Sequence, residues 1–250
     1  MIELTLIGIG TGNPDHLSLQ AVAEIAAAEL ILIPLKGAEK EDLAGLRRSI
    51  CLRHAGPATR IAEFALPTRD AADPDYRHGV KAWHDAIARQ WAATIRAHLP
   101  GLAGKVALLV WGDPSLYDST LRIAGRLEMA LTIRVIPGIT AIQALCAAHA
   151  IPLNAVGAPV QITTGRQLRD HGWPVGVDRI VVMLDGECSF QSLDPQGMTI
   201  WWGAYLAMPE QMLRHGPLAT TGPAIIAARA EARARHGWIM DIYLLERASR

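Results

Sequence analysis

The sequence has few cysteines, and none of them pairs at metal-binding or disulfide spacing. Its three cysteines, Cys51, Cys146 and Cys188, are odd in number and far apart. No C-x-x-C pattern occurs, which excludes the usual zinc spacing and disfavours a disulfide framework. The cysteine usage therefore fits a reducing cytoplasm and predicts no metal site.

The sequence also lacks an excess of charge and a long apolar run. Lys plus Arg and Asp plus Glu each number 24, so the basic footprint that a nucleic-acid partner normally requires is missing. No apolar run approaches the roughly 20 residues that span a bilayer. No basic segment followed by an apolar one precedes the first expected strand. We expect a cytoplasmic protein with neither a membrane nor a nucleic-acid partner.

The first half of the chain alternates expected strands with expected helices. The strands cover residues 4–9, 30–33, 60–66 and 105–110. Before the last strand, apolar residues recur at steps of three and four, as on one face of a helix: Val80, Trp83, Ile87, Trp91 and Ile95. This alternation predicts an α/β fold with a mostly parallel sheet that binds its ligand at the carboxyl ends of the strands.

In the second half of the chain, the expected strands no longer alternate one by one with helices. Strands are expected at 131–136, 160–163, 179–184, 199–206 and 238–245, and helices near 209–214 and 219–236. A chain of this length suits two domains of ordinary size. We place the boundary just after Pro114, which gives an N-terminal α/β domain over residues 1–114 and a C-terminal α/β domain over residues 115–250.

In three short stretches, an expected strand ends in a tight turn of small or rigid residues. They are GIGTGN (8–13), WGDPSLY (111–117) and VIPGITA (135–141). Such turns let backbone N–H and C=O groups face a ligand directly. None of them carries the lysine of a phosphate loop, so the expected ligand is nearly neutral and is held by main chain and small side chains.

A nicotinamide-dependent oxidoreductase is one interpretation of the first turn. A G-x-G after a strand opens the dinucleotide fingerprint, which needs a third glycine at position 13. Asn13 stands there, and the next helix is expected to start late, with Ser18 as its N-cap. No acidic residue ends the second strand to hold a ribose. The spacing therefore favours close approach of a ligand to the backbone but argues only weakly for NAD.

Taken together and in this order, the three turns resemble those of the tetrapyrrole methylases, the class III S-adenosylmethionine methyltransferases. The resemblance implies a two-domain fold with a mostly parallel sheet in the N-terminal domain and a mixed sheet in the C-terminal domain. It also implies S-adenosylmethionine in the cleft between the domains, S-adenosylhomocysteine as product, and a homodimer. Four stretches resemble the cobalamin-pathway branch that methylates precorrin-5 at carbon 1 and releases its acetyl group as acetate: WGDPSLYDST, VVMLDGECSF, WWGAYLAMP and RARHGWIMDIYLL.

The resemblance also implies a set of cofactor-binding residues. Carried over position by position, they are Gly8, Gly10, Thr11, Gly112, Asp113, Leu116, Thr140, Ala141, Leu184, Asp185, Gly203 and Ala204. We expect Asp113 to accept hydrogen bonds rather than act as a base, because Gly112 and Pro114 fix its turn. One position departs from the family, since Pro34 stands where the uroporphyrinogen methylases carry an acidic residue.

Release of the acetyl group needs a water at the acetyl carbonyl, a base for its proton and a donor for the oxyanion. The candidates are polar side chains beside the turns, namely Tyr117, Asp118, Glu187 and Tyr205, with Asp185 and His84 as further possibilities. Each has a structural alternative. Asp118 and Glu187 can cap or begin helices, and His84 can be a surface neighbour of Trp83.

Three other functions stay open at the level of sequence. The chain could be another methylase of the same family, acting on a different precorrin, on diphthamide or on ribosomal RNA. It could be the nicotinamide-dependent oxidoreductase, or a non-catalytic module that senses S-adenosylmethionine. Neutral charge argues against RNA.

Overall fold

The computed structural model describes residues 1–35, 41–68 and 76–248 and divides the chain into two compact units, Met1–Ile139 and Thr140–Arg250. This division lies later in the chain than the boundary expected after Pro114. The reason is β5 (Leu131–Ile136), which pairs with β1 (Ile2–Gly8) in the sheet of the first unit. Residues 115–139 therefore belong with the first unit.

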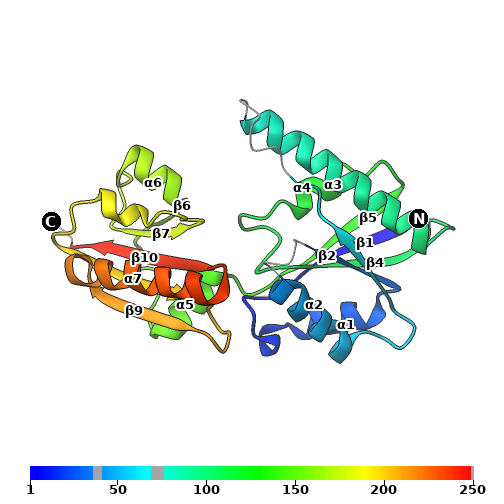
Figure 1. Ribbon diagram of the computed structural model, residues 1–250, viewed down its shortest axis with the longest axis horizontal. Helices are drawn as coiled ribbons and strands as arrows, with labels where there is room; N and C mark the ends of the chain where they lie inside the picture. The colour runs from blue at the N-terminus through cyan, green and yellow to red at the C-terminus, as the bar shows by residue number, and fades with distance from the viewer. Residues whose placement is uncertain (36–40, 69–75, 249–250) are drawn as a thin grey trace. The chain divides into compact units, whose positions relative to one another are not determined.

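The first unit is built on a parallel sheet with strand order β3-β2-β4-β1-β5. Its other strands are β2 (Leu30–Leu35), β3 (Arg60–Ala65) and β4 (Gly104–Val110). α3 (Tyr76–His98) covers one face of this sheet, and α1 (Leu19–Ala27) and α2 (Glu41–His54) cover the other (Figure 1). Two short helices follow strand ends, η1 (Pro14–His16) and α4 (Thr120–Ala124). The predicted parallel α/β fold is confirmed.

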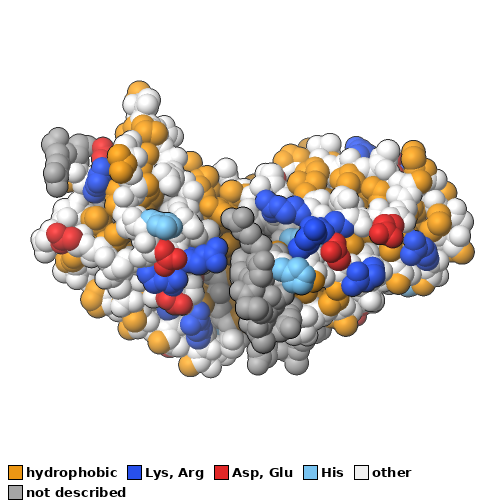
Figure 2. Space-filling model, turned by 90° about the horizontal axis from the view of Figure 1, so that it is seen from above, with side chains coloured by type: hydrophobic (Ala, Val, Ile, Leu, Met, Phe, Trp, Pro, Cys, Tyr) orange, Lys and Arg blue, Asp and Glu red, His pale blue; other side chains and the backbone are white. Residues whose placement is uncertain are grey.

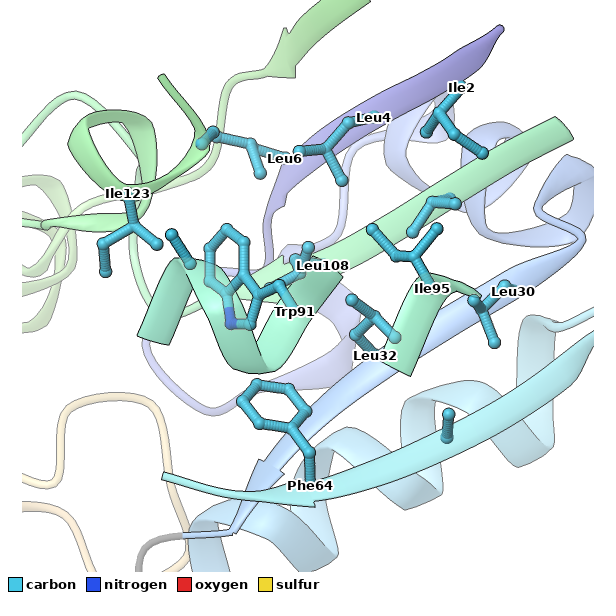
Figure 3. Packing of buried hydrophobic residues seen from close by; sticks show 14 of the residues in the cluster. Ile2, Leu4, Leu6, Leu30, Leu32, Phe64, Trp91, Ile95, Leu108 and Ile123 are labelled. Carbon is cyan, nitrogen blue, oxygen red and sulfur yellow. The ribbon is translucent and has the colours of Figure 1, made fainter. Parts of the chain in front are cut away.

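Successive side chains of a strand point to opposite faces of the sheet, so each strand contributes to the apolar clusters on both faces. In β1, Leu4 and Leu6 join the apolar cluster under α3, whereas Ile7 joins the cluster under α1 and α2. Trp91 and Ile95 of α3 pack over the sheet in Figure 3. Each such fully buried side chain contributes about 1.5–3 kcal/mol relative to exposure. The expected cap is also present, since the Ser18 hydroxyl accepts a hydrogen bond from the Ala21 amide at 3.0 Å.

The second unit contains a mixed sheet with strand order β6-β7-β10-β8-β9. Its strands are β6 (Val160–Thr164), β7 (Arg179–Met183), β8 (Met198–Ala204), β9 (Met212–Pro217) and β10 (Asp241–Arg247). β6 and β7 are parallel, and the remaining pairs are antiparallel. Its helices are α5 (Ala141–His149), α6 (Gly165–His171), α7 (Leu218–His236) and the short η3 (Ser189–Ser192).

One predicted element of the second unit is wrong. We expected a helix near residues 209–214, but Met212 begins strand β9, which pairs with β8 along its whole length. Pairing with a neighbouring strand overrides the weak local preference of such a short segment. Within the described ranges, no helix is both long and apolar enough to cross a membrane. Lys and Arg side chains lie next to Asp and Glu on the face shown in Figure 2, in keeping with the neutral total charge.

Candidate functional site

The three turns predicted from the sequence meet at the carboxyl edge of the first sheet, because β4, β1 and β5 are neighbours in it. The Gly112 amide donates to the Gly10 carbonyl at 2.8 Å, and the Gly10 amide donates to the Gly112 carbonyl at 3.3 Å. A Cβ at Gly8 would lie 2.6 Å from the Gly138 nitrogen, and one at Gly138 would overlap the carbonyl oxygen of Gly112. Only glycine permits this approach of three backbone segments.

Asp113 ties two of these turns together. Its Oδ1 accepts hydrogen bonds from the amide and the hydroxyl of Ser115 at 2.8 and 2.5 Å, and its Oδ2 accepts one from the Gly138 amide at 2.8 Å. Burial alone would raise the pKa of Asp113, but these hydrogen bonds outweigh burial and lower the pKa below its ordinary value. The expectation that Asp113 accepts hydrogen bonds from nearby backbone is confirmed.

Thr11 leaves a polar atom unused beside these glycines. Its side chain is buried, and its hydroxyl oxygen has no hydrogen-bond partner among the residues that the structure describes. The same holds for Nδ1 of His16, whose Cβ lies against Gly10. Buried polar groups are almost always hydrogen-bonded. The Thr11 hydroxyl, next to Gly8, Gly10, Gly112 and Gly138, which we term the glycine cradle, is therefore suited to a polar ligand group.

The third turn leads directly into α5. Thr140 is the N-cap of this helix, because its hydroxyl accepts a hydrogen bond from the Ile142 amide at 3.2 Å and its amide donates to Oε1 of Gln143 at 3.1 Å. Ala141 is the first residue of the helix. This capping box fixes the path of the chain that leaves the glycine turn.

Tyr117 and Asp118 follow the second turn. Tyr117 has a φ of 49°, an uncommon conformation for an aromatic residue, and its side chain is 44% exposed. Partial burial raises the pKa of its hydroxyl, which stays protonated. The Asp118 carboxylate accepts a hydrogen bond from the Thr120 amide at 2.6 Å, at the start of α4. The N-cap of α4 is Ser119, so Asp118 lies one residue before the cap position considered for it and bonds the first amide of the helix from there. Its catalytic role stays a prediction.

Two buried basic side chains, Arg47 and His84, lie near Asp118. Arg47 of α2 donates from Nε to the Leu109 carbonyl at 2.9 Å; burial lowers its pKa to about 10, against the opposing charges of Asp118 and Cys51. His84 of α3 is only 4% exposed, so its interpretation as a surface neighbour of Trp83 is wrong. Its Nε2 finds no partner in the described part of the chain, and burial, Arg126 and Arg122 lower its pKa. His84 is therefore a neutral imidazole near neutral pH.

In the second unit, Leu184 and Asp185 follow β7 and differ in exposure. Leu184 has a φ of 53° and is 66% exposed, whereas Asp185 is buried. Both oxygens of the Asp185 carboxylate are already bound by groups of the protein, including the Tyr243 hydroxyl at 2.7 Å and the Ser189 amide at 2.6 Å. The exposed Glu187 carboxylate pairs with Nη1 of Arg169 at 2.6 Å. Of the two cofactor-binding candidates Leu184 and Asp185, only Leu184 is therefore accessible to a ligand.

Gly203, Ala204 and Tyr205 lie at the end of β8, and all three are buried. A Cβ at Gly203 would lie 2.5 Å from Cδ2 of Leu206, so its small size serves packing. The Tyr205 hydroxyl donates to the Trp238 carbonyl at 2.5 Å, and its ring packs edge-on against Trp238. The structure therefore gives Tyr205 a role within the core of its own unit.

A family model for tetrapyrrole (corrin/porphyrin) methylases matches residues 3–221. The chain belongs to the tetrapyrrole methylase family. It is 46% identical to a precorrin-6A synthase [deacetylating] of Sinorhizobium sp, over 100% of this chain and 97% of that protein. It is also 29% identical to a precorrin-2 C(20)-methyltransferase of Sinorhizobium sp, over 59% of each chain.

Solved structures agree with this tetrapyrrole methylase fold. A putative cobalamin synthesis related protein (CobF) of Corynebacterium diphtheriae superposes with a TM-score of 0.85 at 40% identity, over 100% of both chains. The uroporphyrin-III C-methyltransferase of Thermus thermophilus, solved in complex with S-adenyl homocysteine, superposes with a TM-score of 0.58 at 18% identity, over 98% of this chain and 92% of that one. The second likeness concerns the fold alone.

For this tetrapyrrole methylase, sequence reasoning missed a buried polar network in the second unit. Arg229 of α7 and Asp241 of β10 form an ion pair with Nε 3.1 Å from Oδ2, and each side chain is 7% exposed. Their sequence surroundings gave no signal, because Arg229 lies in a helix rich in arginine and alanine and Asp241 begins an ordinary strand. Only the folded chain brings the two residues together.

Proposed function

We propose that the chain is an S-adenosylmethionine-dependent methyltransferase of cobalamin biosynthesis. It methylates precorrin-5 at carbon 1 and releases the acetyl group as acetate, which gives precorrin-6A. The observation that carries this proposal is the 46% identity to a precorrin-6A synthase [deacetylating], over 100% of this chain and 97% of that protein. The meeting of three glycine turns in the first unit supports it independently.

The residues of these turns fit an adenosyl cofactor. Gly112 has open space where a Cβ would stand, so a ligand can approach its backbone, whereas Gly8 and Gly10 pack tightly against Gly138 and His16. The Thr11 hydroxyl is buried without a partner within the described ranges. Asp113 fixes the turns but carries three hydrogen bonds already. We propose that the cofactor touches Gly8, Gly10, Thr11, Gly112, Leu116, Thr140, Ala141 and Leu184, and that Asp113, Asp185, Gly203 and Ala204 act mainly through the shape of their turns.

When bound, S-adenosylmethionine supplies an electrophilic methyl group on a sulfonium. The protein then has to align donor and nucleophile, and alignment alone can lower a barrier by roughly 7–11 kcal/mol. Turns that are fixed by backbone hydrogen bonds, by glycine packing and by the Asp113 carboxylate meet this need through their shape. The glycine cradle of the first unit is such a rigid support.

Acetyl release makes a second demand. Water adds to the acetyl carbonyl and gives up a proton, the bond between the macrocycle and the acetyl carbon breaks, and its electron pair stays on the macrocycle. We propose Tyr117 as a hydrogen-bond donor to the oxyanion, because its hydroxyl stays protonated and its side chain is partly exposed. Asp118 and Glu187 are candidate bases. Tyr205 is the weakest candidate, because its hydroxyl is bound to the Trp238 carbonyl.

The proposal includes a cytoplasmic homodimer, on the strength of the family resemblance, with precorrin as the only substrate partner and no nucleic acid. Light scattering after size exclusion tests the dimer. Isothermal titration tests the cofactor: S-adenosylhomocysteine should bind stoichiometrically, whereas NAD should not bind. A panel of precorrins then tests the substrate, and turnover of precorrin-2 in preference to precorrin-5 would point to a different methylase of the family.

A further inference from the structure

Arg229 lies at the centre of a buried polar network in the second unit. It comes from α7 and is only 5% exposed. Its Nη2 donates to the Asp185 carbonyl at 2.8 Å, its Nη1 donates to Sγ of Cys188 at 2.6 Å, and its Nε lies 3.1 Å from Oδ2 of Asp241. One guanidinium thus joins a helix, a strand and the segment of residues 184–189, which we term the 184–189 turn.

The 184–189 turn is also fastened from within. The Asp185 carboxylate accepts hydrogen bonds from the Glu187 amide at 3.1 Å, from the Ser189 amide at 2.6 Å and from the Ser189 hydroxyl at 2.9 Å. Tyr243 of β10 adds a fourth bond at 2.7 Å. A Cβ at Gly165 of α6 would overlap the Asp185 carboxylate, so this helix closes the remaining side.

Within this firmly held turn, the conformation and the exposure of Leu184 are both unusual. Its φ of 53° lies in the left-handed region, and its large apolar side chain is 66% exposed. Apart from Gly, Asn and Asp, residues rarely adopt this region. Such a conformation persists only where the surrounding structure over-determines it, and it is typical of ligand-binding segments. The network around Asp185 and Arg229 supplies that over-determination.

The charged groups of the network indicate that it serves to fix the geometry of the 184–189 turn rather than to stabilise the fold. Burial alone would lower the pKa of Arg229, but Asp241, Cys188 and Asp185 raise it, so the guanidinium stays charged. Buried ion pairs are often no more stabilising than apolar side chains of the same volume. An apolar side chain could fill the space of Arg229, but only the planar fork of arginine can reach a carbonyl, a thiol and a carboxylate at once.

We propose that Arg229, oriented by Asp241, is a positioning residue that holds the 184–189 turn in the one conformation that presents Leu184 to the cofactor. This inference rests on the proposed function, since it assumes that an adenosyl cofactor binds at this turn. Arg229 itself touches neither cofactor nor substrate. Its effect is transmitted through the carbonyl of Asp185 and the thiol of Cys188.

The test compares Arg229→Lys with Arg233→Lys. Lysine at 229 keeps the positive charge beside Asp241 but cannot bind the three acceptors together. Arg233 is exposed one turn later on α7, and its Nη2 reaches the Gly186 carbonyl only at 3.4 Å. Loss of charge-assisted hydrogen bonds in Arg229→Lys should weaken S-adenosylhomocysteine binding about tenfold or more and speed amide exchange in residues 184–189 about tenfold. Arg233→Lys should leave both close to wild type.

Amide hydrogen exchange is measured without ligand, so it reports on the fastening of the 184–189 turn independently of cofactor binding. If the wild type fails to bind S-adenosylhomocysteine, the proposed function is wrong, while faster exchange in Arg229→Lys still supports the fastening of the turn. If a folded Arg229→Lys matches wild type in affinity and in exchange, the positioning role is refuted. Should this variant not fold, Asp241→Asn replaces it, because asparagine keeps an oxygen for Trp202 but loses the charge. The affinity for S-adenosylhomocysteine and the amide exchange of residues 184–189 then decide whether the positioning role holds.

Discussion

The meeting of three backbone turns makes a strong prediction for Gly138→Ala. A Cβ at this position would overlap the Gly112 carbonyl oxygen and lie 2.7 Å from the carbonyl carbon of Gly8, and both neighbours are backbone atoms that cannot rotate away. Forcing extra volume into a packed site costs about 1–3 kcal/mol. Any shift of residue 138 also disturbs its 2.8 Å hydrogen bond to the Asp113 carboxylate, which is worth about 1.5–3 kcal/mol.

The expected loss of unfolding free energy is the sum of these terms, about 2.5–6 kcal/mol. For a chain of this size, the loss corresponds to a fall of roughly 5–24 °C in melting temperature. Gly125→Ala is the matched control in the same unit. Its φ is −67°, and a Cβ there would meet nothing closer than 3.7 Å, so its stability should change little.

Thermal unfolding followed by circular dichroism compares the two variants, and titration with S-adenosylhomocysteine follows on each folded sample. Gly138→Ala should lose both stability and affinity, and Gly125→Ala neither. If Gly138→Ala unfolds at the same temperature as the control, the glycine turns do not approach one another as described. The geometric basis of the candidate site would then be refuted.

Three further substitutions test individual side chains. Asp113→Asn should weaken S-adenosylhomocysteine binding without shifting the pH profile of turnover. Because hydrogen bonds lower the pKa of Asp113, its contribution to stability is present above the ordinary pKa and lost as pH falls through the lowered one, so the melting temperatures of wild type and variant should converge in acid. Tyr117→Phe should slow acetate release roughly 10²-fold, measured by enzymatic acetate assay, and leave cofactor affinity unchanged; normal acetate release would remove Tyr117 from the catalytic set. His84→Phe replaces a buried nitrogen that has no partner among the described residues, and it should raise the melting temperature or leave it unchanged. Loss of acetate release in a variant with unchanged melting temperature would instead make His84 catalytic.

Local sequence predicted the features that depend on local physics. Apolar runs predicted the strands of the first sheet and, apart from β9, those of the second. Glycine and proline at strand ends predicted the turns that meet at Gly8, Gly112 and Gly138. The Ser18 cap followed from side-chain chemistry within one helical turn. These features need no knowledge of distant residues.

The features that sequence reasoning missed depend on contacts between distant residues. β5 joins the first unit because it pairs with β1, and β9 is a strand because it pairs with β8. His84 is buried although it lies beside the expected apolar stripe rather than on it. The charge of Arg229 is tolerated inside the second unit only because Asp241 lies 3.1 Å away in the fold. Periodicity and turn chemistry carry no information about such pairings.

The most direct test of the proposed function uses precorrin-5 and S-adenosylmethionine with an isotopically labelled methyl group. Mass spectrometry of the corrin product, together with measurement of acetate and S-adenosylhomocysteine, follows methyl and acetyl groups in one reaction. The account predicts a product that has gained the label and lost the acetyl group, with acetate and S-adenosylhomocysteine formed in equal amounts. Unchanged precorrin-5 in the presence of bound cofactor, or a labelled product that still carries its acetyl group, would contradict it.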